Sequence, residues 1–122
     1  PQKYCTRLMA QSDALILNSL KECGGAVILE AMSMRLPVIA SDWGGPADYL
    51  DSSCGVLVSP TPRANFAQRL AEAIAFLANN PEKARCMGDA GFLRVKEHFD
   101  WEQKIDAIVK IYGDAISRYA KS

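Results

Sequence analysis

Three short apolar runs constrain the fold of this chain more than any other feature of its sequence. They are ALILNSL at residues 14–20, PVIAS at 37–41 and GVLVS at 55–59, and none alternates with polar residues. Such runs are typical of strands that are buried on both faces, as in parallel sheets. The segment between the first two has the length of a crossover helix. The sequence therefore predicts an α/β fold, with a Rossmann-like parallel sheet of about three strands and flanking helices.

The second half of the chain is predicted to be helical from about residue 62 onward. Thr61 and Asn80 each precede a proline, as an N-cap precedes a proline at the first helical position, and Asp100 with Gln103 resembles a capping box. Apolar residues recur at helical spacing at Phe66, Leu70, Ile74 and Leu77, and again at Trp101, Ile105, Ile108, Tyr112 and Ile116. The first dozen residues are also predicted to form a helix, or the end of one.

Composition bounds the size and the partners of the protein. A chain of 122 residues is one domain at most, so we assign residues 1–122 to a single domain. The 14 basic and 14 acidic side chains balance, and no long-range field favours nucleic acid or an anionic membrane. The four cysteines form no C-x-x-C pair, and His98 is the single histidine. This argues against a metal site and for reduced thiols in the cytoplasm. No apolar run reaches the ~18 residues of a membrane span.

Polar or glycine-rich loops follow each predicted strand, at residues 18–25, 41–46 and 59–62. The carboxyl ends of parallel strands meet at one edge of a sheet, where open α/β folds bind their ligands. We therefore expect the functional site at the rim that these three loops share.

The first of these loops carries a glycine pair between two glutamates, in ECGGAVILEAM. A helix beginning near Gly24 or Gly25 would present unpaired N–H groups to an anion such as phosphate. Glu30 would lie about five residues, or ~7 Å, along that helix, where it could accept hydrogen bonds from a ribose. Glu22 would lie on the other side of the phosphate. Either glutamate alone is more commonly a solvated surface residue, and only the ordered set favours a site.

From residue 17 to about 60 the chain closely resembles the nucleotide-binding region of glycosyltransferase family 4, which comprises retaining GT-B enzymes among the group 1 glycosyl transferases. The matching text is SLKECGGAVILEAMSMRLPVIASDWGGPADYLDSSCGVLVSP, with two glutamates eight positions apart, then E-A-M, P-V-I-A and a Gly-Gly turn. FDWEQKIDAIVKIY is similar to the family's C-terminal helix. The resemblance implies the second half of a GT-B C-terminal nucleotide-sugar-binding domain, without its N-terminal acceptor domain.

The resemblance also implies roles for individual residues. Glu30 matches the glutamate that binds the donor ribose, and Glu22, the catalytic candidate, matches the one that faces the transferred sugar. The backbone of Gly24, Gly25 and Ala26 matches the segment that approaches the sugar and diphosphate. The implied substrate is a nucleotide-sugar such as a UDP- or GDP-sugar, used without a metal or cofactor. We expect the 122 residues alone to be inactive. Two alternatives remain, a non-catalytic nucleotide-binding module and a Rossmann-like interaction domain.

Three positions depart from the family pattern. Cys23 replaces a glycine, Gly24 replaces an aromatic residue, and Arg35 stands where a glycine commonly ends the helix. A left-handed arginine costs about 1 kcal/mol, so we expect the helix to end differently here. The loss of the aromatic predicts a more flexible loop. Trp43 is expected to pack on the rim, and neither Cys23 nor His98 is expected to take part in chemistry.

The order of strands predicts how the chain associates. In the common doubly wound order 3-2-1-4-5-6 the three strands correspond to 4, 5 and 6, which leaves residues 14–20 without their usual neighbour. That edge contains no proline and no inward charge. We therefore expect a homodimer through this strand edge or the face beside it.

Overall fold

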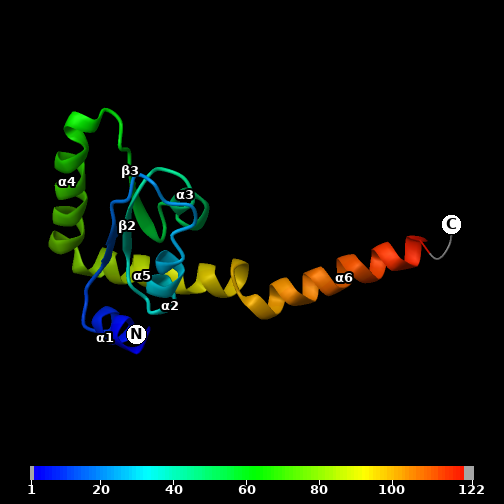
Figure 1. Ribbon diagram of the computed structural model, residues 1–122. Helices are drawn as coiled ribbons and strands as arrows, with labels where there is room; N and C mark the ends of the chain where they lie inside the picture. Colours follow the sequence, from blue (N-terminus) through cyan, green and yellow to red (C-terminus); the bar gives the residue numbers. More distant parts are fainter. Residues whose placement is uncertain (1, 120–122) are drawn as a thin grey trace.

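The computed structural model describes residues 2–119 and contains the parallel sheet that the apolar runs predict (Figure 1). Strands β1 (Leu15–Leu17), β2 (Val38–Ser41) and β3 (Gly55–Val58) lie in the order β1-β2-β3, and both neighbouring pairs are parallel. In the register, Ile39 lies opposite Ile16 of β1 and Val56 of β3. The predicted α/β fold class is confirmed.

Helices connect and flank the strands. Helix α1 (Gln2–Met9) precedes the sheet, α2 (Val27–Ser33) follows β1, and the short α3 (Pro46–Tyr49) follows β2. After β3 the chain is largely helical, with a 3-10 turn η1 (Arg63–Asn65), α4 (Phe66–Asn79), α5 (Pro81–His98) and α6 (Trp101–Tyr119). Asn80 is the N-cap of α5 and Pro81 begins that helix, as the sequence predicts.

The sheet separates two apolar cores, one on each face. Successive side chains of a strand point to opposite faces, so β2 contributes Val38 and Ala40 to one core and Ile39 to the other. Helix α2 covers the first face, where Ile28 and Met32 are fully buried. The second face is covered by α4 and α5, which supply Ala73, Leu77 and Met87. Burial on both faces explains why the strand runs lack alternation.

The first strand and the first crossover helix are shorter than predicted. Strand β1 ends at Leu17, whereas the predicted apolar run extends to residue 20. The residues from Asn18 onward belong to the loop. Helix α2 begins at Val27, two or three residues later than expected. Gly25 has φ of +63°, which an α-helix does not accommodate, so the helix forms only after it.

Two of the predicted caps also differ. Pro62 is the N-cap of η1, and α4 begins only at Phe66. The Asp100 carboxylate accepts a hydrogen bond from the Glu102 N–H at 2.8 Å, but Gln103 does not close a capping box. Its side-chain amide donates instead to the Lys96 carbonyl, also at 2.8 Å. This contact ties the start of α6 to the end of α5.

The end of α2 corrects one expectation directly. Arg35 does adopt the left-handed conformation, with φ of +60°. Its guanidinium pairs with Asp89 of α5 at 2.6 Å and stacks over the Phe92 ring at 4.0 Å. Gly88 permits the approach, because a side chain there would put its Cβ 2.0 Å from the Arg35 carbonyl oxygen. Contacts with α5 thus offset the strain of a left-handed arginine.

Helix α6 and the outer edge of β1 are two uncovered parts of the described residues. Helix α6 extends away from the sheet and contains no buried residue (Figure 1). No helix among residues 2–119 is both long and apolar enough to cross a membrane. Strand β1 has no further strand beside it among these residues. A groove of about 540 Å³ lies there, lined in part by Ile16, Ile39 and Ile74.

Candidate functional site

Two loops at the carboxyl ends of β1 and β2 lie in backbone contact. We call them the ECGG loop (residues 22–25) and the glycine turn (residues 44–45). A side chain at Gly45 would put its Cβ 2.8 Å from the carbonyl oxygen of Gly24, and one at Gly44 would put it 2.8 Å from that of Glu22. Only glycine permits so close an approach. The structure therefore brings both segments together at one rim, as the sequence predicts.

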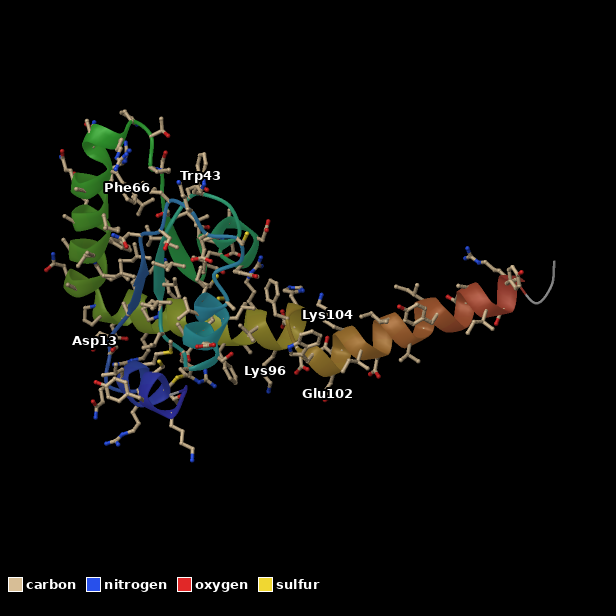
Figure 2. All side chains as sticks on the ribbon, in the orientation of Figure 1. Asp13, Trp43, Phe66, Lys96, Glu102 and Lys104 are labelled. Atoms are coloured by element: carbon tan, nitrogen blue, oxygen red, sulfur yellow. The ribbon has the colours of Figure 1, made fainter. Side chains whose placement is uncertain are left out.

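The end of β3 joins the same rim. The Asp42 N–H donates to the Val58 carbonyl at 2.9 Å, which continues the pairing of β2 with β3 by one residue. Trp43 follows Asp42 and leads into the glycine turn. Figure 2 shows Trp43 at this end of the sheet, and its side chain is 55% exposed. Trp43 therefore lies at the rim, as the sequence predicts, with about half of its surface exposed to solvent.

Within the ECGG loop, a glycine amide and a carboxylate form a hydrogen bond. The Gly25 N–H donates to Glu22 Oε1 at 3.2 Å. Gly25 itself is buried, and a Cβ there would lie 3.2 Å from Leu17 and 3.5 Å from Ile28. Both the positive φ and the tight packing require glycine at this position. The carboxylate of Glu22 is consequently oriented toward the backbone of the loop.

The predicted anion-binding amides are only partly available. The amide of Gly25 is taken by Glu22, whereas no hydrogen bond of the Gly24 or Ala26 N–H to another described residue is found. Glu30 is exposed and lies in the first turn of α2. It is three residues beyond the start of the helix, a rise of ~4.5 Å rather than ~7 Å. Glu30 still lies five residues after Gly25, so the later start of α2 does not bring it nearer to the loop.

Cys23 and His98 carry no chemistry that the structure supports. Cys23 is an exposed, free thiol in the ECGG loop. His98 is the last residue of α5, and its ring meets that of Phe99 edge-on. Among residues 2–119 there is no group of three or more His, Cys, Asp or Glu side chains arranged to hold a metal ion.

Sequence reasoning missed a group of residues behind the rim. Arg94 of α5 donates through Nε to the Tyr49 carbonyl at 2.7 Å and pairs with Asp51 at 2.9 Å. Two hydrogen bonds from Ser53 lower the pKa of Asp51, and the charge of Arg94 adds to this effect. Burial raises the pKa of the neighbouring Cys54 thiol. Arg94 is 45 residues from Tyr49, and no local pattern marks such a pair.

One buried polar atom also lies at the rim. The Ser41 side chain, at the carboxyl end of β2, is fully buried, and its hydroxyl oxygen has no hydrogen-bond partner among the described residues. A buried hydroxyl without a partner costs about 1–3 kcal/mol. No local pattern in the sequence indicates that this hydroxyl is buried.

Comparisons with known proteins match this arrangement to one family. A model of the family described as group 1 glycosyl transferases matches residues 1–94. The alpha-maltose-1-phosphate synthase of Mycolicibacterium smegmatis is 33% identical over 115 residues, which are 92% of this chain and 30% of that protein.

Two solved structures share the fold. The sucrose-phosphate synthase of Thermosynechococcus elongatus superposes with a TM-score of 0.81 at 30% identity, over 95% of this chain and 28% of its own. HepE of Anabaena in complex with UDP superposes with a TM-score of 0.80 at 25% identity. The match covers 88% of this chain and 29% of the HepE chain. The chain thus spans less than a third of each of these relatives. Because the family match covers most of its residues, the chain belongs to the group 1 glycosyl transferases, with the α/β fold of a GT-B domain.

Proposed function

We propose that this chain is the donor-binding portion of a family 4 glycosyltransferase. The longer enzyme would transfer a sugar from a nucleotide-sugar to an acceptor, with retention and without a metal ion. The contact between the glycine turn and the ECGG loop carries this proposal, because it gathers amide groups and a carboxylate at the rim where parallel sheets bind ligands. The similarity to HepE, which was solved with UDP, supports a nucleoside diphosphate as the ligand.

The proposed roles divide the site between its two glutamates. Glu30 accepts hydrogen bonds from the ribose, and Glu22 faces the transferred sugar. The Gly24 and Ala26 amides stabilise the departing diphosphate, whereas the Gly25 amide orients Glu22. Gly25 remains part of the binding segment, because its left-handed backbone lets the loop turn sharply into α2. Amides that stabilise the leaving group make a metal ion unnecessary.

The acceptor site belongs to a part of the enzyme outside this chain. The chain spans 12–30% of the curated relatives named sucrose synthase and alpha-maltose-1-phosphate synthase that it matches first. We propose that it is the second half of a C-terminal donor domain, and that an N-terminal domain binds the acceptor. Alone it should bind donor nucleotide weakly, near the millimolar range, and transfer nothing, since catalysis needs both substrates in one closed cleft.

Nucleotide titration tests the proposed site. Saturation-transfer NMR with UDP and GDP should detect binding by the 122-residue chain, and Glu30→Ala should abolish it. Glu102→Gln, an exposed change on α6, serves as the control and should leave binding intact. If neither nucleotide binds at several millimolar, the donor-site assignment is wrong.

Kinetics of a longer enzyme that contains this chain separate the two glutamates. Glu30→Ala should weaken donor binding by about 1.5–3 kcal/mol, the usual loss for a charge-assisted pair of hydrogen bonds. Glu22→Gln should lower kcat more than the affinity for nucleoside diphosphate, because its partner is the sugar. Equal losses of nucleotide affinity in both variants would contradict this division. Binding without any turnover would instead favour the non-catalytic module.

We also propose that the unpaired edge of β1 associates with a second copy of the chain. The edge is apolar, and Ile16 and Ile74 in the lining of the groove beside it are partly exposed. Sedimentation at high micromolar concentration should show a dimer, and a monomer would contradict the proposal.

A cytoplasmic location is proposed from the four free thiols, and a fluorescent fusion of the longer enzyme would test it.

A further inference from the structure

The short helix α3 begins against Gly24 and ends with a tyrosine whose hydroxyl lies near it. At its start, Gly45 packs on the backbone of Gly24, where a Cβ would lie 2.8 Å from the carbonyl oxygen and 2.9 Å from Cα. At its end, Tyr49 places its hydroxyl 3.8 Å from the position that a Cβ of Gly24 would take. The hydroxyl is the only atom in the described residues, sequence neighbours aside, within 4 Å of that position. This single turn of helix thus lies beside the centre of the ECGG loop.

Helix α3 has only four residues and cannot hold its own position. A single helical turn is unstable in isolation, since nucleation is unfavourable. Its carboxyl end is fixed by Arg94 of α5, whose Nε donates to the Tyr49 carbonyl at 2.7 Å. The same guanidinium pairs with Asp51, in the loop after α3, at 2.9 Å. The Arg94 and Asp51 side chains are 28% and 45% exposed, so solvent screens this pair only in part.

The Tyr49 ring is held as well as its carbonyl. It meets the Phe99 ring edge-on, with the ring centres 5.4 Å apart. Phe99 directly follows α5, so both supports of Tyr49 come from the same end of that helix. The contacts thus run from α5 to Tyr49 at the end of α3, and from Gly45 at the start of α3 to Gly24. Movement at the end of α5 would therefore displace the ECGG loop.

We propose that Arg94 and Tyr49 are positioning residues of the donor site, which fix the ECGG loop through α3. The inference rests on the proposed function, because the loop matters for transfer only if it binds the donor. Neither residue needs to touch the donor. Arg94 acts through the Tyr49 carbonyl, and the Tyr49 ring on Phe99 helps to hold α3 beside Gly24.

A second arginine provides a matched control. Arg35 also joins α5 through an aspartate, with Asp89 at 2.6 Å, and also stacks on an aromatic ring, that of Phe92. It lies at the opposite end of α2 from the ECGG loop. Arg94→Met and Arg35→Met thus remove comparable contacts, of which only the first leads to the loop.

Hydrogen exchange of the Gly25 amide in the full 122-residue chain tests the proposal without any ligand. This amide reports the bond to Glu22. Arg94→Met should speed its exchange at least 10-fold, and Arg35→Met less than 2-fold, after correction for any change in global unfolding. Equal acceleration in both variants, or none in Arg94→Met, would overturn the proposal. UDP titration should likewise show at least a 5-fold loss of affinity in Arg94→Met alone.

Tyr49 variants keep the proposal testable if Arg94→Met does not fold. Tyr49→Phe retains the ring and the carbonyl and should keep Gly25 exchange within 2-fold of the parent chain. Tyr49→Ala removes the ring that packs on Phe99 and holds the end of α3, and it should accelerate exchange as Arg94→Met does. A normal Gly25 amide in Tyr49→Ala would overturn the role of Tyr49. If UDP and GDP bind to no variant and not to the parent, the proposed function fails, and the exchange data alone still decide whether the loop is positioned in this way.

Discussion

Helices α4 and α6 carry the same kind of apolar stripe but meet different surroundings. In α4 the stripe packs on the sheet through Phe66, Leu70 and Leu77, of which Leu77 is 6% exposed, whereas Ile74 is 39% exposed. In α6 every residue is exposed, including Trp101 at 74% and Tyr119 at 88%. Figure 1 shows α4 alongside the strands and α6 extending away from them. An amphipathic pattern therefore identifies the face that a helix would bury, but not the surface that covers it.

The two helices should consequently differ in what stabilises them. Most helical stability in proteins comes from packing of the apolar face, and isolated helices of this length are marginal in water. Helix α4 has that packing, whereas α6 depends on its own hydrogen bonds and on the contact of Gln103 with α5. We expect mutations in the body of the molecule to change global stability and mutations in α6 to leave it nearly unchanged.

The largest effect is expected for Ile39→Ala. Ile39 is 1% exposed and lies in the core between β2 and α4. Removing its outer carbons should lower the free energy of unfolding by about 2–5 kcal/mol, because a cavity remains. Urea denaturation followed by circular dichroism would measure the loss. Ile108→Ala on α6, where Ile108 is 46% exposed, is the control and should change it by less than about 0.5 kcal/mol.

A pair of glycines gives the next comparison. A Cβ at Gly88 of α5 would lie 2.0 Å from the Arg35 carbonyl, whereas one at Gly113 of α6 would meet nothing within 4 Å. Gly88→Ala should therefore destabilise the body by about 1–3 kcal/mol through overpacking. Gly113→Ala should raise the helicity of α6, with a gain in propensity of about 1 kcal/mol, and leave the urea midpoint of the body unchanged. A lower urea midpoint in Gly88→Ala alone, with higher helicity in Gly113→Ala alone, is the critical outcome.

The free energy of unfolding should depend on pH through the ionisation of the Asp51 carboxyl. Its pKa is lowered below the ordinary value of 3.8, chiefly by hydrogen bonds from Ser53, so folding favours the ionised form. Its contribution is complete above pH 3.8 and declines as pH falls from there toward the folded pKa. Asp51→Asn should cost about 0.5–1 kcal/mol near pH 7, the range for a half-exposed ion pair. Urea midpoints of the two proteins should converge below about pH 4, and a difference that persists would contradict this assignment.

The smallest effect is expected for Ile111→Ser on α6. Ile111 is 65% exposed and contributes to no core. The free energy of unfolding of the body should change by less than about 0.5 kcal/mol. Leu77→Ser on α4, which buries a polar group in the core, is the matched comparison and should cost several times more. A loss above about 1 kcal/mol in Ile111→Ser would show that α6 packs against the body in solution.

Much of the fold follows from local patterns in the sequence. The three apolar runs placed all three strands, and Asn80 with Pro81 marked the start of α5. Phe66, Leu70 and Leu77 of the predicted stripe lie on the sheet, whereas Ile74 is exposed. These features were predictable because each depends on residues close together in the chain.

Features that depend on distant residues were not predictable. The start of α2 is delayed because Glu22 and Leu17 hold Gly25 in a left-handed turn. The left-handed Arg35 is stabilised by side chains of α5, more than 50 residues away. The support of Tyr49 by Arg94 is equally remote. The sequence thus indicated which residues gather at the rim, and tertiary contacts determined their geometry.

The hydrogen bond between the Gly25 N–H and Glu22 lowers the conformational entropy of the Glu22 side chain. A glutamate free to rotate at a protein surface samples many rotamers, and restricting it to one costs up to about 2 kcal/mol. Here the restriction occurs when the chain folds, because the amide that holds Oε1 belongs to the same loop. A ligand that hydrogen-bonds to the other carboxylate oxygen therefore meets a side chain whose freedom is already reduced. Its binding free energy is correspondingly less diminished by the ordering of Glu22.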